Sequence, residues 1–71
     1  MKEYAAVLEK TSPDWSAYFP DLPGLDVTGP TSEATEQLLR EGIAFHIEGM
    51  IADGYPIPEP TTRVPCMPIS A

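Results

Sequence analysis

Apolar residues at alternate positions predict two β-strands near the start of the chain. Residues 3–9 and 15–19 both follow this pattern, which matches the alternating side-chain directions of a strand. In the first strand Tyr4, Ala6 and Leu8 point one way and Ala5 and Val7 the other, so both faces are rather apolar. In the second strand Trp15, Ala17 and Phe19 share one face. Residues 10–14 between them have the composition of a turn. We therefore expect a β-hairpin.

Proline and glycine then mark a third strand and the start of a long helix. Two prolines within residues 20–24 remove backbone donors, so this segment is expected to bend into a short strand over residues 25–28. Thr31 has a side chain suited to an N-cap. The helix is predicted to run from there to about Asp53, because Gly54 favours its termination.

The predicted helix has an apolar arc that is wider than one sheet contact requires. At about 100° per residue, the arc comprises Leu38, Leu39, Ile43, Phe45, Ile47 and Met50. The sheet is expected to cover part of this arc. Either the C-terminal tail or another subunit is expected to cover the rest. Gly42 and Gly49 also lie in the arc, where their low helix propensity has two explanations: a close backbone approach, which we favour, or a tolerant position.

Prolines at alternate positions over residues 55–60 predict an extended strap after the helix. Residues 61–64 are expected to add a short final strand, which two later prolines confine to a sheet edge. The predicted fold is therefore α+β, in the order β-β-β-α-β, with a three-stranded antiparallel sheet and one long helix on one face. We expect a single domain over residues 1–71, with the sheet and helix in 1–54 and the strap in 55–71.

The charge of the chain favours a basic partner. The net charge is −7, the four basic residues are dispersed, and the 42% hydrophobic content is sufficient for a folded domain. Such a field repels nucleic-acid phosphates, so direct nucleic-acid binding is not expected. It attracts basic proteins and speeds their encounter, although it also serves solubility alone.

Size and cysteine content add two expectations. A chain of 71 residues has a small core, which together with the wide apolar arc predicts a homo-oligomer. Cys66 is the only cysteine, and no signal peptide or membrane-spanning stretch is recognisable. These features predict a cytoplasmic protein that does not enter the membrane.

The sequence contains no motif that couples a nucleophile to a base. Cys66 lies in a proline-rich tail, whereas His46 falls within the apolar arc, where a core or interface role is expected. Asp14, Asp21 and Asp26 lie near strand ends and would suit Mg²⁺ if they converged, but solvated turn residues are the favoured interpretation. We therefore expect no catalytic residues, no metal and no cofactor.

Three segments carry a resemblance to a known family. They are Phe19-Pro20-Asp21-Leu22-Pro23-Gly24, the helix end Glu48-Gly49-Met50-Ile51-Ala52-Asp53-Gly54, and Pro56-Ile57-Pro58-Glu59-Pro60. Together with Gly29 and Thr31 between them, they resemble the HicB antitoxin family over residues 3–61. The chain departs from the family pattern at Leu25, where Cys is frequent, and at Pro30, where an acidic residue is frequent.

The resemblance implies a degenerate ribonuclease H-like fold without nuclease chemistry. It also implies a partner, since HicB-like domains bind small basic HicA-type toxins that cleave mRNA. Asp14, Trp15, Asp21 and Asp26 are the predicted partner-binding residues, although turn or core roles account for each as well, and Asp21 also suits a hydrogen bond within its own bend. Full-length HicB proteins carry a C-terminal DNA-binding domain, and direct operator binding by this chain is not expected.

Two other hypotheses remain open at this stage. One is an orphan domain that only associates with itself, through strand edges or the wide helix face. The other, less favoured, is a metal-dependent nuclease that uses the same aspartates.

Overall fold

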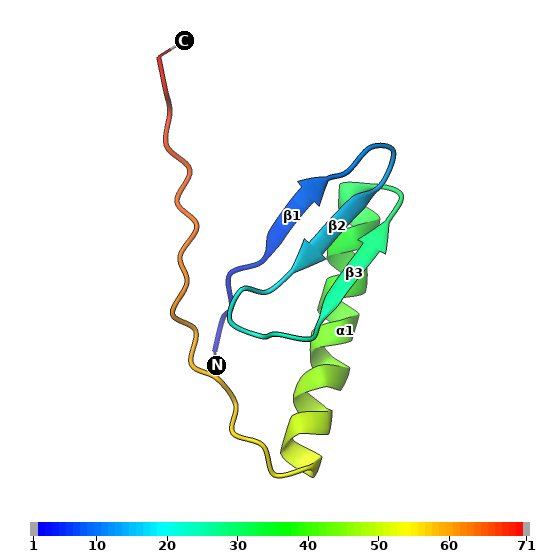
Figure 1. The fold of residues 1–71 in the computed structure, drawn as a ribbon, viewed down its shortest axis with the longest axis vertical. Helices are drawn as coiled ribbons and strands as arrows, with labels where there is room; N and C mark the ends of the chain where they lie inside the picture. The colour runs from blue at the N-terminus through cyan, green and yellow to red at the C-terminus, as the bar shows by residue number, and fades with distance from the viewer. Residues whose placement is uncertain (1, 71) are drawn as a thin grey trace.

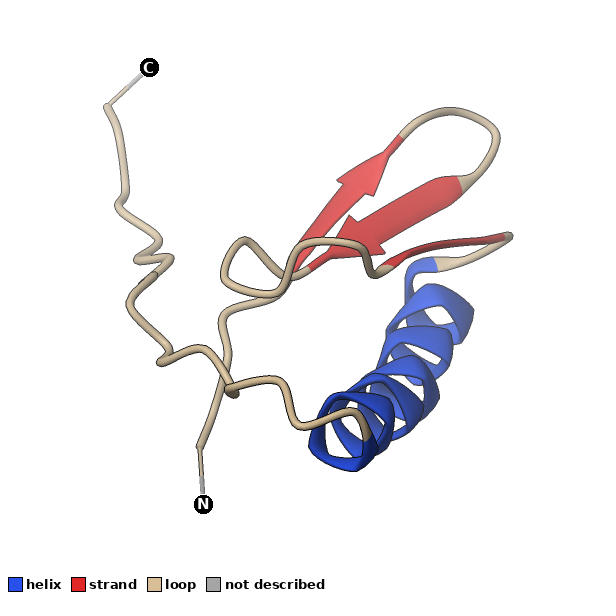
Figure 2. Ribbon diagram, turned by 60° about the horizontal axis from the view of Figure 1, so that its bottom comes forward, coloured by secondary structure: helices blue, strands red, loops and turns tan. Residues whose placement is uncertain are grey.

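Three short strands form an antiparallel sheet in the order β1-β2-β3 (Figure 1). The computed structural model describes residues 2–70, in which the strands are β1 (Val7–Lys10), β2 (Trp15–Tyr18) and β3 (Asp26–Gly29), and the helix is α1 (Ser32–Ala52). The predicted hairpin, third strand and helix are confirmed, and the fold is α+β. Figure 2 shows the helix on one side of the sheet only.

The first strand is shorter than the predicted segment 3–9. β1 begins at Val7, which lies opposite Tyr18 in the register with β2. Residues before Val7 would therefore pair beyond the end of β2, where Pro20 has no backbone N–H to donate. The ladder ends where its partner strand ends.

The ends of α1 follow the predicted signals. The Thr31 hydroxyl accepts a hydrogen bond from the Ala34 N–H at 3.0 Å, which satisfies one of the free donors of the first turn. At the other end, Asp53 is the C-cap and Gly54 has φ of +76°. That left-handed conformation is readily accessible to glycine.

The core lies between the sheet and one face of α1. Its buried apolar side chains are Ala17, Phe19, Leu22 and Leu39, and partly buried residues such as Leu8, Val27 and Ile43 pack around them. Thr35 is also fully buried, and its hydroxyl donates to the Thr31 carbonyl oxygen at 2.6 Å. The only charged or polar side chain among the buried residues described is therefore satisfied by its own helix.

Close approach between β3 and α1 depends on Gly29. A Cβ atom at this position would lie 2.6 Å from the Thr35 Oγ1 atom and 3.1 Å from its backbone nitrogen. The two predicted glycines of the helix differ: a Cβ on Gly42 would lie 3.2 Å from the Leu25 Cδ1 atom, whereas Gly49 has open space. The expectation of a close approach is thus confirmed at Gly42 and wrong at Gly49.

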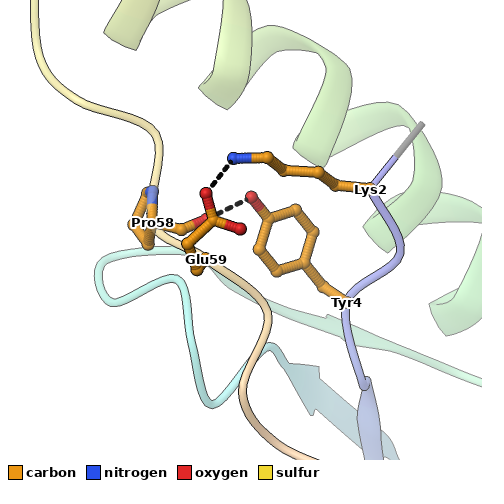
Figure 3. A network of polar contacts seen from close by, with 4 residues as sticks. All are labelled: Lys2, Tyr4, Pro58 and Glu59. Atoms are coloured by element: carbon orange, nitrogen blue, oxygen red, sulfur yellow. Dashed lines mark hydrogen bonds and ion pairs between the residues drawn. The ribbon is translucent and has the colours of Figure 1, made fainter.

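The strap is fastened to the N-terminal segment. The Tyr4 hydroxyl donates to the Pro58 carbonyl oxygen at 2.6 Å, and the Lys2 ammonium pairs with the Glu59 carboxylate at 2.9 Å (Figure 3). The Tyr4 ring also packs edge-on against Phe19, with 6.4 Å between ring centroids. The two contacts with the strap join residues more than 50 positions apart in the sequence.

The predicted final strand over residues 61–64 is wrong. Within the described residues 55–70, the backbone is extended but belongs to no strand (Figure 1). The N–H groups of Thr61 and Thr62 donate to the Asp21 carboxylate instead of to a sheet edge. Pro60 and Pro65 have no N–H to offer a ladder on either side.

The wide apolar arc of the helix is only partly covered. Ile57 of the strap lies beside Ile43 and Ile47, which accounts for one flank. On the other flank, Leu38 and Phe45 are exposed, by 43% and 76%. The tail therefore covers part of the arc, and the part that contains Phe45 faces solvent.

Within residues 2–70, the structure has no helix that is both long and apolar enough to cross a membrane.

We predict that Leu39→Ala destabilises the protein by about 2–5 kcal/mol. The substitution removes most of a side chain that is only 2% exposed and leaves a cavity in a small core. A domain of this size has a total stability of only about 4–10 kcal/mol, so the variant should be largely unfolded at elevated temperature. Leu38→Ala is the matched control, since its exposed side chain should cost less than about 1 kcal/mol. Urea unfolding followed by Trp15 fluorescence measures both, and equal losses would contradict the placement of the core.

Candidate functional site: the open face of the sheet

The face of the sheet opposite α1 has no helix over it (Figure 2). Two cross-strand rows lie on this face, Val7–Tyr18–Asp26 and Glu9–Ser16–Thr28. The alternate rows, which contain Leu8, Ala17 and Val27, face the helix and the core. We call the two outward rows the open face.

The open face is polar and acidic. Glu9 and Asp26 are exposed carboxylates at opposite corners, while Tyr18 lies between them in the middle strand with 39% of its surface exposed. The hydroxyl groups of Ser16 and Thr28 complete the surface, and its two rows contain no basic residue. An aromatic ring flanked by carboxylates and hydroxyls suits a basic protein surface.

The loop between β2 and β3 borders this face. A depression of about 340 Å³ is lined by β2, β3 and the loop residues Pro23 and Gly24. Gly24 has φ of +93°, a conformation that favours glycine, and its Cβ position is open. The depression is shallow and has no buried charged group, so it offers a contact surface more readily than an enclosed reaction site.

The structure separates the four predicted partner-binding residues. Asp14 is exposed in the β1–β2 turn, and Trp15 is half-buried on the helix side of the sheet, opposite Gly29. Asp26 lies at the other end of the strands, opposite Tyr18, about 10 Å from the Trp15–Gly29 pair by strand rise. Asp26 is the one of the four that belongs to the open face.

Asp21 is engaged within the chain. Its Oδ2 atom accepts hydrogen bonds from the N–H groups of Thr61 and Thr62, each at 2.9 Å. Its Oδ1 atom accepts from the hydroxyls of the same two residues, at 3.0 and 2.8 Å. The carboxylate therefore ties the β2–β3 loop to the end of the strap, rather than bonding its own bend.

These bonds change the acidity of Asp21. The pKa of the Asp21 carboxyl is lowered from its ordinary value. The largest cause is the hydrogen bond from the Thr62 backbone N–H, followed by the one from the Thr62 hydroxyl, and the bonds from Thr61 act in the same direction. A lowered pKa in the folded state means that the contact is fully present above the unfolded-state pKa. It is lost as the pH falls through the lower, folded-state pKa.

Potential metal-binding side chains are dispersed. In the part of the chain that the structure describes, no three His, Cys, Asp or Glu side chains form a group able to hold a metal ion. Cys66 is exposed in the tail, whereas His46 borders a groove on α1. The three aspartates near strand ends do not converge.

Sequence reasoning missed Glu9, Tyr18 and the two threonines that hold Asp21. Glu9 and Tyr18 follow from strand alternation, because they fall on the opposite side from Leu8 and Ala17. The contact between Asp21 and Thr61 spans 40 residues, so no local pattern indicates it.

We predict that Asp21→Asn loosens the end of the strap, because the neutral amide keeps one acceptor oxygen and loses the negative charge that strengthens the four bonds. Amide hydrogen exchange at Thr61 and Thr62 should then accelerate at least about fivefold. Asp26→Asn removes a carboxylate without a strap contact and should leave both rates unchanged.

Acidification of the unaltered chain provides a second check of the same contact. Below about pH 4, protonation of Asp21 should shift the amide resonances of Thr61 and Thr62 together with the Asp21 carboxyl resonance. Independent titration of the threonine amides and the carboxyl would argue against the contact.

Comparison with known proteins places these features in a family. The chain matches, over residues 4–66, the family model described as HicB_like antitoxin of bacterial toxin-antitoxin system. A curated relative, the uncharacterized 14.9 kDa protein in the rep-hol intergenic region of Haemophilus phage HP1 (strain HP1c1), is 34% identical over 56 residues. The alignment spans 79% of this chain but only 42% of that relative. No solved structure matches the chain.

The family match includes all three strands, the helix and the fastened part of the strap. It extends beyond the segments that carry the sequence motifs and includes both partners of the Asp21–Thr62 contact. The chain belongs to the HicB-like antitoxin family of bacterial toxin–antitoxin systems.

Proposed function

We propose that this protein is an antitoxin that binds and neutralises a small basic toxin of the HicA type, which cleaves mRNA. The observation that carries the proposal is the family match over residues 4–66. Membership in an antitoxin family implies a toxin as the partner, and the charge of this chain favours a basic one. The site of action would be the cytoplasm, where such a toxin meets mRNA.

Electrostatics supports a basic partner. The chain has 11 acidic and four basic residues, which give a net charge of −7. A field of this sign accelerates association with a cationic protein and keeps the antitoxin away from the toxin's own RNA substrate. Competition between antitoxin and RNA for one basic surface is a direct route to neutralisation.

The open face is the proposed contact surface. Glu9 and Asp26 would pair with basic side chains of the toxin, and Tyr18 between them would supply apolar contact. Asp14 in the β1–β2 turn would extend the acidic rim. Trp15 and Asp21 would act indirectly, because Trp15 faces the helix side and Asp21 is bonded to the strap.

We infer that this protein acts by binding and not by catalysis, in keeping with a degenerate ribonuclease H-like origin. The antiparallel sheet with a helix on one face supports that relation, as does the family resemblance of the loop and helix-end motifs. The open face offers carboxylates at separated corners and no adjacent nucleophile and base.

We predict that Glu9→Lys combined with Asp26→Lys abolishes protection in cells that co-express a HicA-type toxin. The two changes replace attraction by repulsion on the open face, and the dissociation constant should rise at least about 30-fold. Growth rescue and co-purification measure the effect, and calorimetry with a catalytically inactive toxin measures the affinity.

The matched control is Glu41→Lys combined with Glu48→Lys, on the exposed outer side of α1. This control changes the net charge by the same amount. If the position of the charges on the open face determines binding, the control should weaken binding no more than about threefold. Equal loss in both double variants would contradict the open face as the contact surface. A toxin that stays lethal and does not co-purify with the unaltered chain would contradict the antitoxin function itself.

A further inference from the structure

A groove lies at the C-terminal end of α1, away from the open face. It is lined by Pro23, Phe45, His46, Gly49, Met50, Asp53 and Tyr55, and its volume is about 490 Å³. Phe45 is 76% exposed and Tyr55 64% exposed, so the largest apolar side chains of the groove face solvent. Aromatic groups exposed to this extent around a groove are typical of a surface that binds protein.

The same molecule has a C-terminal segment whose apolar side chains are exposed. Hydrogen bonds fasten the strap as far as Thr62, but none joins residues 63–70 to the rest of the described chain. Within that segment, Val64, Met67 and Ile69 are 55%, 76% and 85% exposed. We call residues 63–70 the free tail.

The free tail is directed away from the groove of its own molecule. Thr62 is held at Asp21, and the C-terminal segment extends away from both the sheet and the end of α1 (Figures 1 and 2). Val64 and Met67 each precede a proline, which keeps their backbone extended and opposes a reversal toward the groove. A stiff, outward-pointing tail is suited to reach another molecule.

Charge distinguishes the tail from the rest of the chain. All 11 acidic residues lie at or before Glu59, together with three of the four basic ones, so residues 1–59 carry a net charge of −8. Residues 60–71 contain Arg63 as their only charged residue. The tail is thus complementary to the acidic body of a second copy, whereas two bodies brought face to face repel each other.

We propose that the free tail of one molecule occupies the α1 groove of a second copy. The apolar side chains of the tail would cover Phe45 and Tyr55, and Arg63 would lie near Asp53 at the rim. The proposal concerns self-association and does not depend on the identity of the toxin.

Surface area is consistent with this assembly. The chain exposes 5456 Å², whereas a compact monomer of 7.7 kDa is expected to expose about 4,300 Å². The difference exceeds the roughly 800 Å² that each partner contributes to a standard interface. The excess surface of the chain is therefore large enough for one side of a specific dimer interface.

A crosslinking experiment tests the arrangement directly. Gly49→Cys places a thiol in the groove, where the added side chain has open space. Under mild oxidation of the full chain, it should join Cys66 of another molecule and give a covalent dimer or a longer chain of copies on a non-reducing gel. Ala44→Cys is the control, because residue 44 is exposed on another side of α1. It should give no more crosslinking than the unaltered chain, in which only Cys66 of one molecule can react with Cys66 of another.

A second measurement uses the oligomeric state. Sedimentation of the unaltered chain should reveal a dimer or higher oligomer at micromolar concentration, and Phe45→Ser or the pair Met67→Ser and Ile69→Ser should each raise its dissociation constant at least tenfold. Ile51→Ser changes an exposed side chain that is not part of the groove and should have no such effect. Far-UV circular dichroism verifies that all variants remain folded.

Three outcomes would overturn the proposal. One is an unaltered chain that stays monomeric, and another is a Gly49→Cys product that migrates as an oxidised monomer, which would place the tail in its own groove. The third is an oligomer that Phe45→Ser weakens but the tail substitutions do not, which would indicate helix-to-helix association.

Discussion

One helix packs against one face of a three-stranded sheet, and this unequal covering determines most of the remaining structure. Leu8, Ala17 and Val27 point toward α1, so their neighbours along each strand must point toward solvent. The approach of the two layers requires Gly29, because any Cβ there would meet Thr35. The same packing that forms a small core therefore also creates a polar surface opposite it, available to a partner.

Local signals in the sequence predicted the elements well. The N-cap Thr31, the terminating Gly54 and the turn between β1 and β2 act through bonds or torsions of a few residues, so the sequence indicates them directly. Among these N-terminal elements, the length of β1 was misjudged, because it is set by the extent of β2. That dependence is tertiary, and no pattern within residues 3–9 contains it.

The long-range contacts were not predictable in the same way. Asp21 was assigned to a partner surface or to its own bend, but its hydrogen bonds reach residues 40 positions away. The same contact explains why residues 61–64 form no strand, since the amide groups that a ladder would use are already bonded. Glu9 and Tyr18 could have been placed on the open face from alternation alone, once the hairpin register was known.

The way in which the strap is fastened has a consequence for the order of folding. The sheet and α1 are complete in sequence by Ala52, whereas Lys2 and Tyr4 meet their partners only at Pro58 and Glu59. During synthesis, these contacts cannot form before Pro58 and Glu59 have been added, whereas hairpins and helices form within microseconds once their own residues are free to fold. The newly made protein therefore passes through a stage in which the hairpin and helix have formed while the N-terminal segment and the strap are still apart, and only emergence of Pro58 and Glu59 from the ribosome allows them to be joined.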